Sequence, residues 1–76
     1  MNKHTRDELE KIHRNLEVIQ MDLTSFSEVE QEKYENSPDS LKETDRVLAY
    51  ETAAELLFDA ANSVGDAMDS IVAAMD

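Results

Sequence analysis

The stretch VLAYETAAELLFDAANSVGDAMDSIVAAM, residues 47–75, decides the fold. Its apolar residues recur at alternating intervals of three and four over more than four heptads. That period places them on one face of an α-helix that packs against a neighbouring helix. The seam residues are Val47, Tyr50, Ala54, Leu57, Ala61, Val64, Met68, Ile71 and Met75. We therefore predict a long helix over about residues 41–75.

The rows beside this seam are also apolar. Ala53, Ala60, Ala67 and Ala74 form one flank, and Phe58, Gly65 and Val72 form part of the other. A face this wide exceeds what a two-stranded contact needs, so the helix should meet more than one neighbour. The small side chains would let those neighbours approach closely.

A second seam lies upstream, within a predicted helix over about residues 6–35. Its residues are Leu9, Ile12, Leu16, Ile19, Leu23 and Phe26. Thr5 and Glu8 have the spacing of a capping box at its start. Glu30 and Lys33 interrupt the seam in the last third, where Val29 and Tyr34 are expected to take over.

Residues 36–40, Asn-Ser-Pro-Asp-Ser, are the strong helix breaker between the two seams. Ser37 is suited to cap the second helix with Pro38 in its first turn, and Leu41 is expected to pack at this corner. Two long helices and a short turn predict an all-α fold, an antiparallel helical hairpin spanning residues 1–76 as one domain. Dimerisation into a four-helix bundle would cover the wide apolar face; an extended monomer with an exposed apolar face is the alternative.

Composition excludes several classes of function. Lys plus Arg is 7 and Asp plus Glu is 18, for a net charge of -11. This charge would repel nucleic acid and anionic lipid. The chain has no cysteine, one glycine and no apolar run long enough for a membrane span. We expect a cytoplasmic protein without cofactor, small-molecule substrate, membrane contact or direct nucleic-acid contact.

The charges are unevenly distributed along the chain. Residues 1–14 carry a net charge of +1, whereas the last 30 residues contain no Lys or Arg. The acids near the C-terminus oppose the dipole of their own helix. An antiparallel hairpin would place them beside the basic N-terminal segment, which favours that arrangement.

Carboxylates at helical spacing form the candidate partner surface. They are Glu51, Glu55 and Asp59 on the second helix and Glu28, Glu32 and Glu35 on the first. Such a row, with about 6 Å between neighbours, could imitate a nucleic-acid backbone and occupy the binding groove of a basic protein. The alternative interpretation is a solvated face that keeps the bundle soluble.

Metal and acid–base chemistry find little support in the sequence. Glu10 and His13 have the Glu-x-x-His spacing of di-iron bundles, but no second copy exists. The acids of the second helix lie off its apolar rows, so none is expected to be buried in a carboxylate pair. We expect no catalytic residues, no metal site and no enzyme activity.

The stretch EVEQEKYENSPDSLKETDR, residues 28–46, resembles the signature of small acidic proteins of phages and prophage-like elements. Ser37 stands where that family usually has an apolar residue, and Thr44 where it usually has serine. The resemblance implies a helical hairpin and a mobile-element origin but no activity, because the family is largely of unknown function. Asn36, Pro38, Leu41 and Tyr34 would build the hairpin corner, with Arg46 pairing with Glu43 or Glu35.

These observations favour a non-enzymatic interaction protein of a phage or prophage. Its partner would be a basic host or phage protein, and its sharpest form would be an inhibitor that mimics nucleic acid. The alternative is a structural or assembly protein whose main partner is itself. The expected self-association face combines Leu9, Ile12, Leu16, Ile19, Leu23, Phe26, Tyr50, Leu57, Phe58, Val64, Met68 and Ile71.

Overall fold

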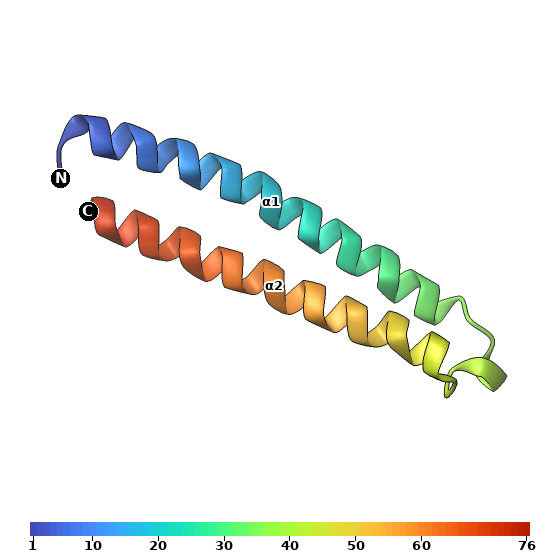
Figure 1. Cartoon of the computed structure of the whole chain (residues 1–76). Coiled ribbons are helices and arrows are strands. Elements are labelled where there is room, and N and C mark those ends of the chain that lie inside the picture. The colour runs from blue at the N-terminus through green and yellow to red at the C-terminus, as the bar shows by residue number, and fades with distance from the viewer.

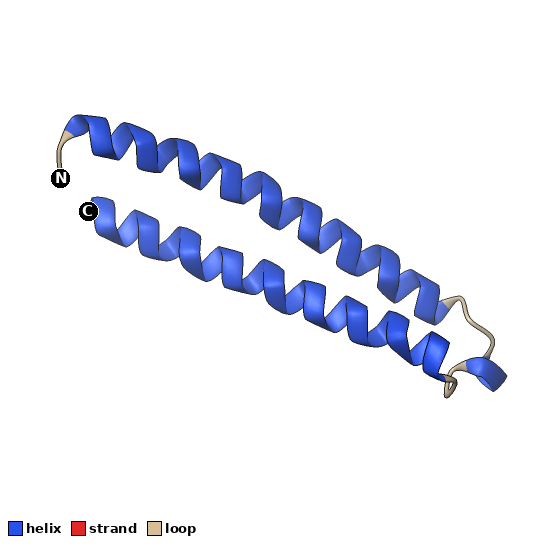
Figure 2. Ribbon diagram, in the orientation of Figure 1, coloured by secondary structure: helices blue, strands red, loops and turns tan.

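The computed structural model describes residues 1–76 and is an antiparallel pair of long helices (Figure 1). Helix α1 spans Lys3–Glu35, the short 3-10 helix η1 spans Asp39–Leu41, and α2 spans Asp45–Met75. The chain contains no strand, and its two termini lie at the same end (Figure 2). The predicted all-α two-helix hairpin is therefore confirmed.

The hairpin is a thin rod rather than a globule. Its principal extents are 59 × 15 × 13 Å, and its radius of gyration is 17.3 Å. A compact chain of this length would have a radius of gyration of about 11 Å. The rod exposes 5516 Å², whereas a compact protein of this mass exposes about 4,700 Å². Only four residues are buried, so a single hairpin has almost no closed core.

The seam of α2 faces α1 along its whole length, as the sequence predicts. All nine seam residues are buried or half-buried. Val47, Ala54 and Ala61 are the most deeply covered, each at 6% exposure or less. Two of the three are alanines, so α1 approaches α2 closely at these levels.

The face of α1 that meets α2 differs in part from the predicted seam. Leu9, Leu16 and Leu23 are half-buried against α2, as expected. Their companion row in the interface is polar and consists of His13, Gln20, Ser27 and Tyr34, all buried or half-buried. The other row of the predicted seam, Ile12, Ile19 and Phe26, stays exposed. α1 is thus rotated so that its larger apolar row lies beside the interface.

Hydrogen bonds between the helices explain this rotation. Ser27 Oγ donates to the carbonyl oxygen of Ala54 at 2.8 Å, and Gln20 Nε2 donates to that of Ala61 at 3.0 Å. The alanines leave room for a polar side chain to reach the opposite backbone. The two bonds also fix the register. Ser27 follows Gln20 by seven residues on α1, and its partner Ala54 precedes Ala61 by seven residues on α2.

Gly65 accommodates the Gln20 side chain. A Cβ added at this glycine would lie 2.7 Å from Gln20 Nε2, which is closer than non-bonded atoms tolerate. A glycine inside a helix costs about 1 kcal/mol relative to alanine. Here that cost accompanies a hydrogen bond between the helices.

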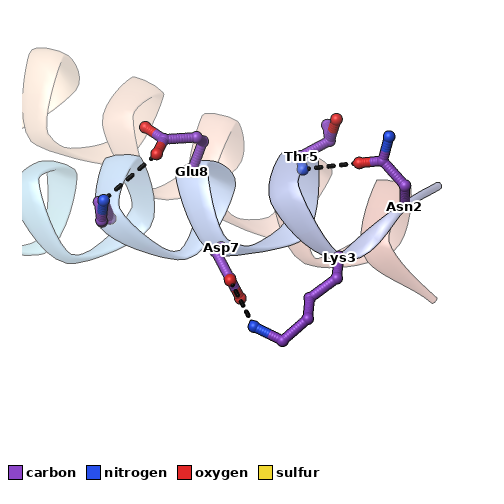
Figure 3. Close-up of polar contacts among 6 residues, drawn as sticks. Asn2, Lys3, Thr5, Asp7 and Glu8 are labelled. Carbon is purple, nitrogen blue, oxygen red and sulfur yellow. Dashed lines mark hydrogen bonds and ion pairs between the residues drawn. The ribbon is translucent and has the colours of Figure 1, made fainter.

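The N-terminus of α1 is capped one turn earlier than predicted. Asn2 is the N-cap residue, and its Oδ1 accepts a hydrogen bond of 2.8 Å from the backbone N–H of Thr5 (Figure 3). The helix therefore starts at Lys3 instead of residue 6, and no capping box forms between Thr5 and Glu8. Glu8 instead accepts a hydrogen bond from Lys11.

The corner between the helices is longer than predicted. α2 begins at Asp45 rather than near residue 41, so the connection runs over residues 36–44. Ser37 does not cap α2, because its Oγ donates back to the carbonyl oxygen of Lys33 at 2.7 Å. Thr44 holds the N-cap position of α2 instead. Residues 39–41 form the separate turn η1, which delays the start of the helix.

Aromatic side chains with lysines hold this corner, and Leu41 does not. Leu41 is 47% exposed, contrary to the expected packing role. Lys42 Nζ lies 5.3 Å from the centroid of the Tyr34 ring, and Lys33 Nζ lies 5.7 Å from that of Tyr50. Both distances suit cation–π contacts, and each contact joins two different elements.

All ion pairs are local. Lys3 pairs with Asp7, Lys11 with Glu8, Lys33 with Glu30 and Lys42 with Asp39, each three or four residues apart. The expected pairing of Arg46 with Glu43 or Glu35 is absent. The basic N-terminal segment and the acidic end of α2 do lie side by side (Figure 1), yet no ion pair joins the helices.

Candidate interaction surfaces

Two shallow grooves between the helices lie on the same side of the hairpin. One, of about 280 Å³, is lined by Ser27, Glu28, Gln31, Ala54, Glu55 and Phe58. The other, of about 250 Å³, is lined by Glu10, His13, Arg14, Val72 and Met75. Glu10 and Gln31 are three heptads apart on α1, and Phe58 and Val72 are two heptads apart on α2. The same helix rows therefore border one side along the rod.

This side collects carboxylates, and we call it the acidic side. Its members either line a groove or lie one or two heptads from a residue that does. Between residues 10 and 72 they are Glu10, Glu17, Glu28, Glu35, Glu51, Glu55 and Asp69. Arg14 is the only basic side chain in these rows between residues 10 and 72. The result is one long flank of strongly negative potential.

The opposite side is apolar. On each helix, the row on the other side of the seam from the groove row faces the opposite side of the rod. These two rows carry no charge from Ile12 to Phe26 and from Ala53 to Ala74, and Lys33 and Arg46 continue them at the turn end. We define the apolar side as Ile12, Ile19 and Phe26 of α1 with Ala53, Leu56, Ala60, Ala67 and Ala74 of α2. Its large members are at least 45% exposed. The α2 rows on this side contain no charged residue from Val47 to Met75.

The six predicted acidic residues do not form one surface. Glu28, Glu35, Glu51 and Glu55 belong to the acidic side. Glu32 and Asp59 belong to helix rows whose members are all exposed, on the outer faces of α1 and α2. The row Glu51, Glu55, Asp59 thus winds from the acidic side onto the outer face, because a step of four residues overshoots one helical turn.

The predicted self-association residues separate into three groups. Most of them pack within the single hairpin and are half-buried there: Leu9, Leu16, Leu23, Tyr50, Leu57, Val64, Met68 and Ile71. Ile12, Ile19 and Phe26 remain free on the apolar side, while Phe58 lies in a groove of the acidic side. Leu56 was not predicted, although its spacing of three from Ala53 and four from Ala60 marks the same flank.

The environment of Tyr34 changes its pKa. The Glu51 carboxylate raises the pKa of Tyr34 above its usual value, by hydrogen bonding to the phenol and by its negative charge. Partial burial adds to the increase, and the positive charge of Lys42 opposes it. This interaction links the end of α1 to the second turn of α2.

The Glu-x-x-His pair of α1 lies in one of the two grooves. Glu10 and His13 share a groove with Arg14, a cation that would repel a bound metal ion. The hairpin contains no group of three or more side chains suited to hold a metal ion. Neither helix has a stretch both apolar enough and long enough to span a bilayer.

Comparisons with protein-family models, curated proteins and solved structures found no match to this chain.

Proposed function

We propose that this protein is a non-enzymatic interaction protein that dimerises into a four-helix bundle and presents its acidic side to a basic protein. The resemblance of residues 28–46 to a family of phages and prophage-like elements supports a mobile-element origin. No carboxylate is buried, whereas acid–base catalysis by a carboxylate pair depends on burial to separate the two pKa values. Binding therefore fits these side chains better than catalysis.

The carboxylates along one side of the rod carry this proposal. A solubilising charge alone could be spread over all outer faces of the rod. Seven of the 18 carboxylates instead lie along one flank, where Arg14 is the only base between residues 10 and 72. An extended negative flank attracts and orients a positively charged groove, and this attraction weakens with salt. An inhibitor that mimics nucleic acid is the sharpest form of this idea.

The test compares two variants of equal net charge. In the first, the acidic side is neutralised by Glu17→Gln, Glu28→Gln and Glu55→Gln. In the second, matched acids outside it are neutralised by Glu8→Gln, Glu32→Gln and Asp59→Asn. Each immobilised protein captures partners from a host lysate at low salt, and bound proteins are eluted with high salt and identified by mass spectrometry.

We expect a basic nucleic-acid-binding protein to be captured by the wild type and the second variant and lost with the first. Equal capture by both variants would show that only net charge matters and would reject a role for the acidic side. Circular dichroism controls for unchanged helicity in each variant.

A structural or assembly role is the second candidate, and the exposed apolar residues favour it. Twelve large hydrophobic residues are exposed, whereas only four residues of the chain are buried and three of these are hydrophobic. A rod of this kind gains stability mainly by joining another helical surface. In this case the protein's main partner would be itself, and the lysate experiment would recover only the bait.

A further inference from the structure

We propose that a second copy of this chain covers the apolar side, with α1 of each copy lying over α2 of the other and both turns at the same end. This inference rests on the proposed dimer and adds its face, its register and its orientation. Three properties of the apolar side identify a second copy as its partner. They are its complementarity to an identical surface, the absence of carboxylates from its rows, and the area that a dimer would bury.

The apolar side is complementary to its own copy. α1 contributes a ridge of large residues, Ile12, Ile19 and Phe26, spaced seven apart. α2 contributes a groove lined by Ala53, Ala60, Ala67 and Ala74 at the same spacing, with Leu56 as its one large residue, so helices can approach closely along most of it. A two-fold axis parallel to the rod places each ridge over the other copy's groove. The contact is therefore made twice, as an isologous interface requires.

The register within the hairpin places each large residue of the α1 ridge at the same height along the rod as a gap in the α2 groove. The hydrogen bonds from Gln20 to Ala61 and from Ser27 to Ala54 fix which residues lie at the same level of the rod. By this register Ile19 lies level with residue 62, between Ala60 and Ser63. Ile12 lies level with residue 69 and Phe26 with residue 55, in the equivalent gaps one heptad away. A rotation about the rod axis preserves these levels in the dimer.

Ile12 and Ile19 then pack against small residues, whereas Phe26 packs between Ala53 and Leu56. In the other two-fold arrangement, with the turns at opposite ends, α1 would lie over α1 and α2 over α2. The large residues of the two α1 helices would then meet each other, and the alanines of the two α2 helices would meet each other. The two α1 helices would therefore lie farther apart than the two α2 helices. Interdigitation of large and small rows gives an evenly packed bundle.

The charge distribution also favours this face. Two copies each carry a net charge of -11 and repel one another. Contact through the apolar sides turns both acidic sides outward, and each hairpin is 13 to 15 Å across. The acidic sides are then farther apart than the Debye length of about 8 Å at physiological salt. Added salt should tighten this dimer, in contrast to the binding of a basic partner.

The area is sufficient for a stable dimer. Each free hairpin exposes 5516 Å². Two of them together expose about 3,000 Å² more than a compact protein of twice the mass. Permanent homodimers bury about 2,000–5,000 Å² in total. The excess surface of the rod thus corresponds to one interface between copies.

The orientation is tested by a distance between spin labels. The chain contains no cysteine, so Ser40→Cys in the exposed turn gives one labelling site per copy. In the full-length dimer we expect the two nitroxides to lie within about 25 Å, roughly two helix diameters. A distance close to the 59 Å length of the rod would overturn the same-end orientation and leave the dimer intact.

The face is tested by a matched pair of substitutions. Phe26, on the apolar side, is 61% exposed in the free hairpin, and Phe58, on the acidic side, is 55% exposed. We expect Phe26→Asp to weaken dimerisation at least a hundredfold in sedimentation equilibrium and Phe58→Asp to change it less than tenfold. The reverse order would assign the interface to the other side. A monomeric wild type would contradict the proposed dimer itself.

Discussion

Gln20 shows how one polar side chain can fix the alignment of two helices. Its amide reaches the carbonyl oxygen of Ala61 only because Gly65 leaves the intervening space empty. Ser27 makes the equivalent bond to Ala54 one heptad away and is the only buried polar residue. A leucine at either position could pack against α2 in more than one alignment, because hydrophobic contacts are not directional. The two hydrogen bonds join specific atoms and therefore specify a single register.

A double-mutant cycle tests the coupling of Gln20 and Gly65. In a Gln20→Ala background, Gly65→Ala should raise the free energy of unfolding by about 1 kcal/mol through helix propensity. In the wild-type background the added Cβ displaces the amide, and loss of a hydrogen bond worth about 1 kcal/mol should cancel this gain. Urea denaturation followed by circular dichroism measures all four proteins at equal concentration. Equal effects of Gly65→Ala in both backgrounds would contradict the coupling.

The interaction of Tyr34 with Glu51 predicts a specific loss of stability at high pH. The usual pKa of a tyrosine is 10.0, and that of Tyr34 is raised in the folded state. As the pH rises through about 10, the unfolded chain loses this proton first, so the free energy of unfolding decreases. The stability advantage of the wild type over Tyr34→Phe should therefore shrink above pH 10. Parallel curves of stability against pH for the two proteins would refute the interaction.

At the scale of the element, the alanines in the seam of α2 set the separation of the helices. Ala61 is 3% exposed and lies directly against Gln20. Ala61→Leu should push the helices apart and lower the free energy of unfolding by about 1–3 kcal/mol. Ala73→Leu, on the exposed outer face of the same helix, is the matched control and should cost little. A similar midpoint of thermal unfolding for both variants would contradict close contact at Ala61.

The N-cap of α1 can be assigned by local exchange. Removal of the Asn2 side chain by Asn2→Ala should speed amide hydrogen exchange in the first turn, since a lost cap costs about 1 kcal/mol of helix stability. Thr5→Ala should leave exchange nearly unchanged, because the Thr5 side chain caps nothing in the structure and only its N–H is bonded. Faster exchange in Thr5→Ala than in Asn2→Ala would contradict the Asn2 cap and support the capping box predicted from the sequence.

The sequence predicts α2 well and the orientation of α1 less well. All seam residues of α2 are apolar at an unbroken heptad spacing, so the periodicity has one solution. On α1 two solutions compete, because Leu9, Leu16 and Leu23 can be paired with either the isoleucine row or the row of His13, Gln20, Ser27 and Tyr34. Hydrophobicity selects the first for a lone seam. The structure uses the second, since alanines opposite allow polar side chains to reach backbone carbonyls.

The two sides of the rod could not be separated from the sequence for a related reason. The acidic residues were grouped by spacings of three and four along each helix, which follow the chain around its axis. Which rows of α1 and α2 share a flank depends on the register and rotation of the pair, and hence on contacts such as Gln20 to Ala61. Glu32 and Asp59 were grouped with the others for this reason, although both lie on outer faces.

At the scale of the whole molecule, one side of the rod carries carboxylates beside exposed Phe58 and Val72, and the rows of the opposite, apolar side hold no carboxylate. A thin hairpin with four buried residues has little stability of its own, and a second layer of helices would supply the missing core. The bundle would conceal the apolar side and display two acidic sides facing away from each other. Self-association and partner binding thus use different surfaces of the same chain.

The molecular mass in solution tests this account most directly. Sedimentation equilibrium at low and high salt should give twice the chain mass of 8.6 kDa, with a dissociation constant that falls as salt screens the acidic charge. A mass of 8.6 kDa at every salt concentration, up to the highest protein concentration reached, would contradict the dimer. A dimer that dissociates as salt increases would show that charge, rather than the apolar side, holds the copies together.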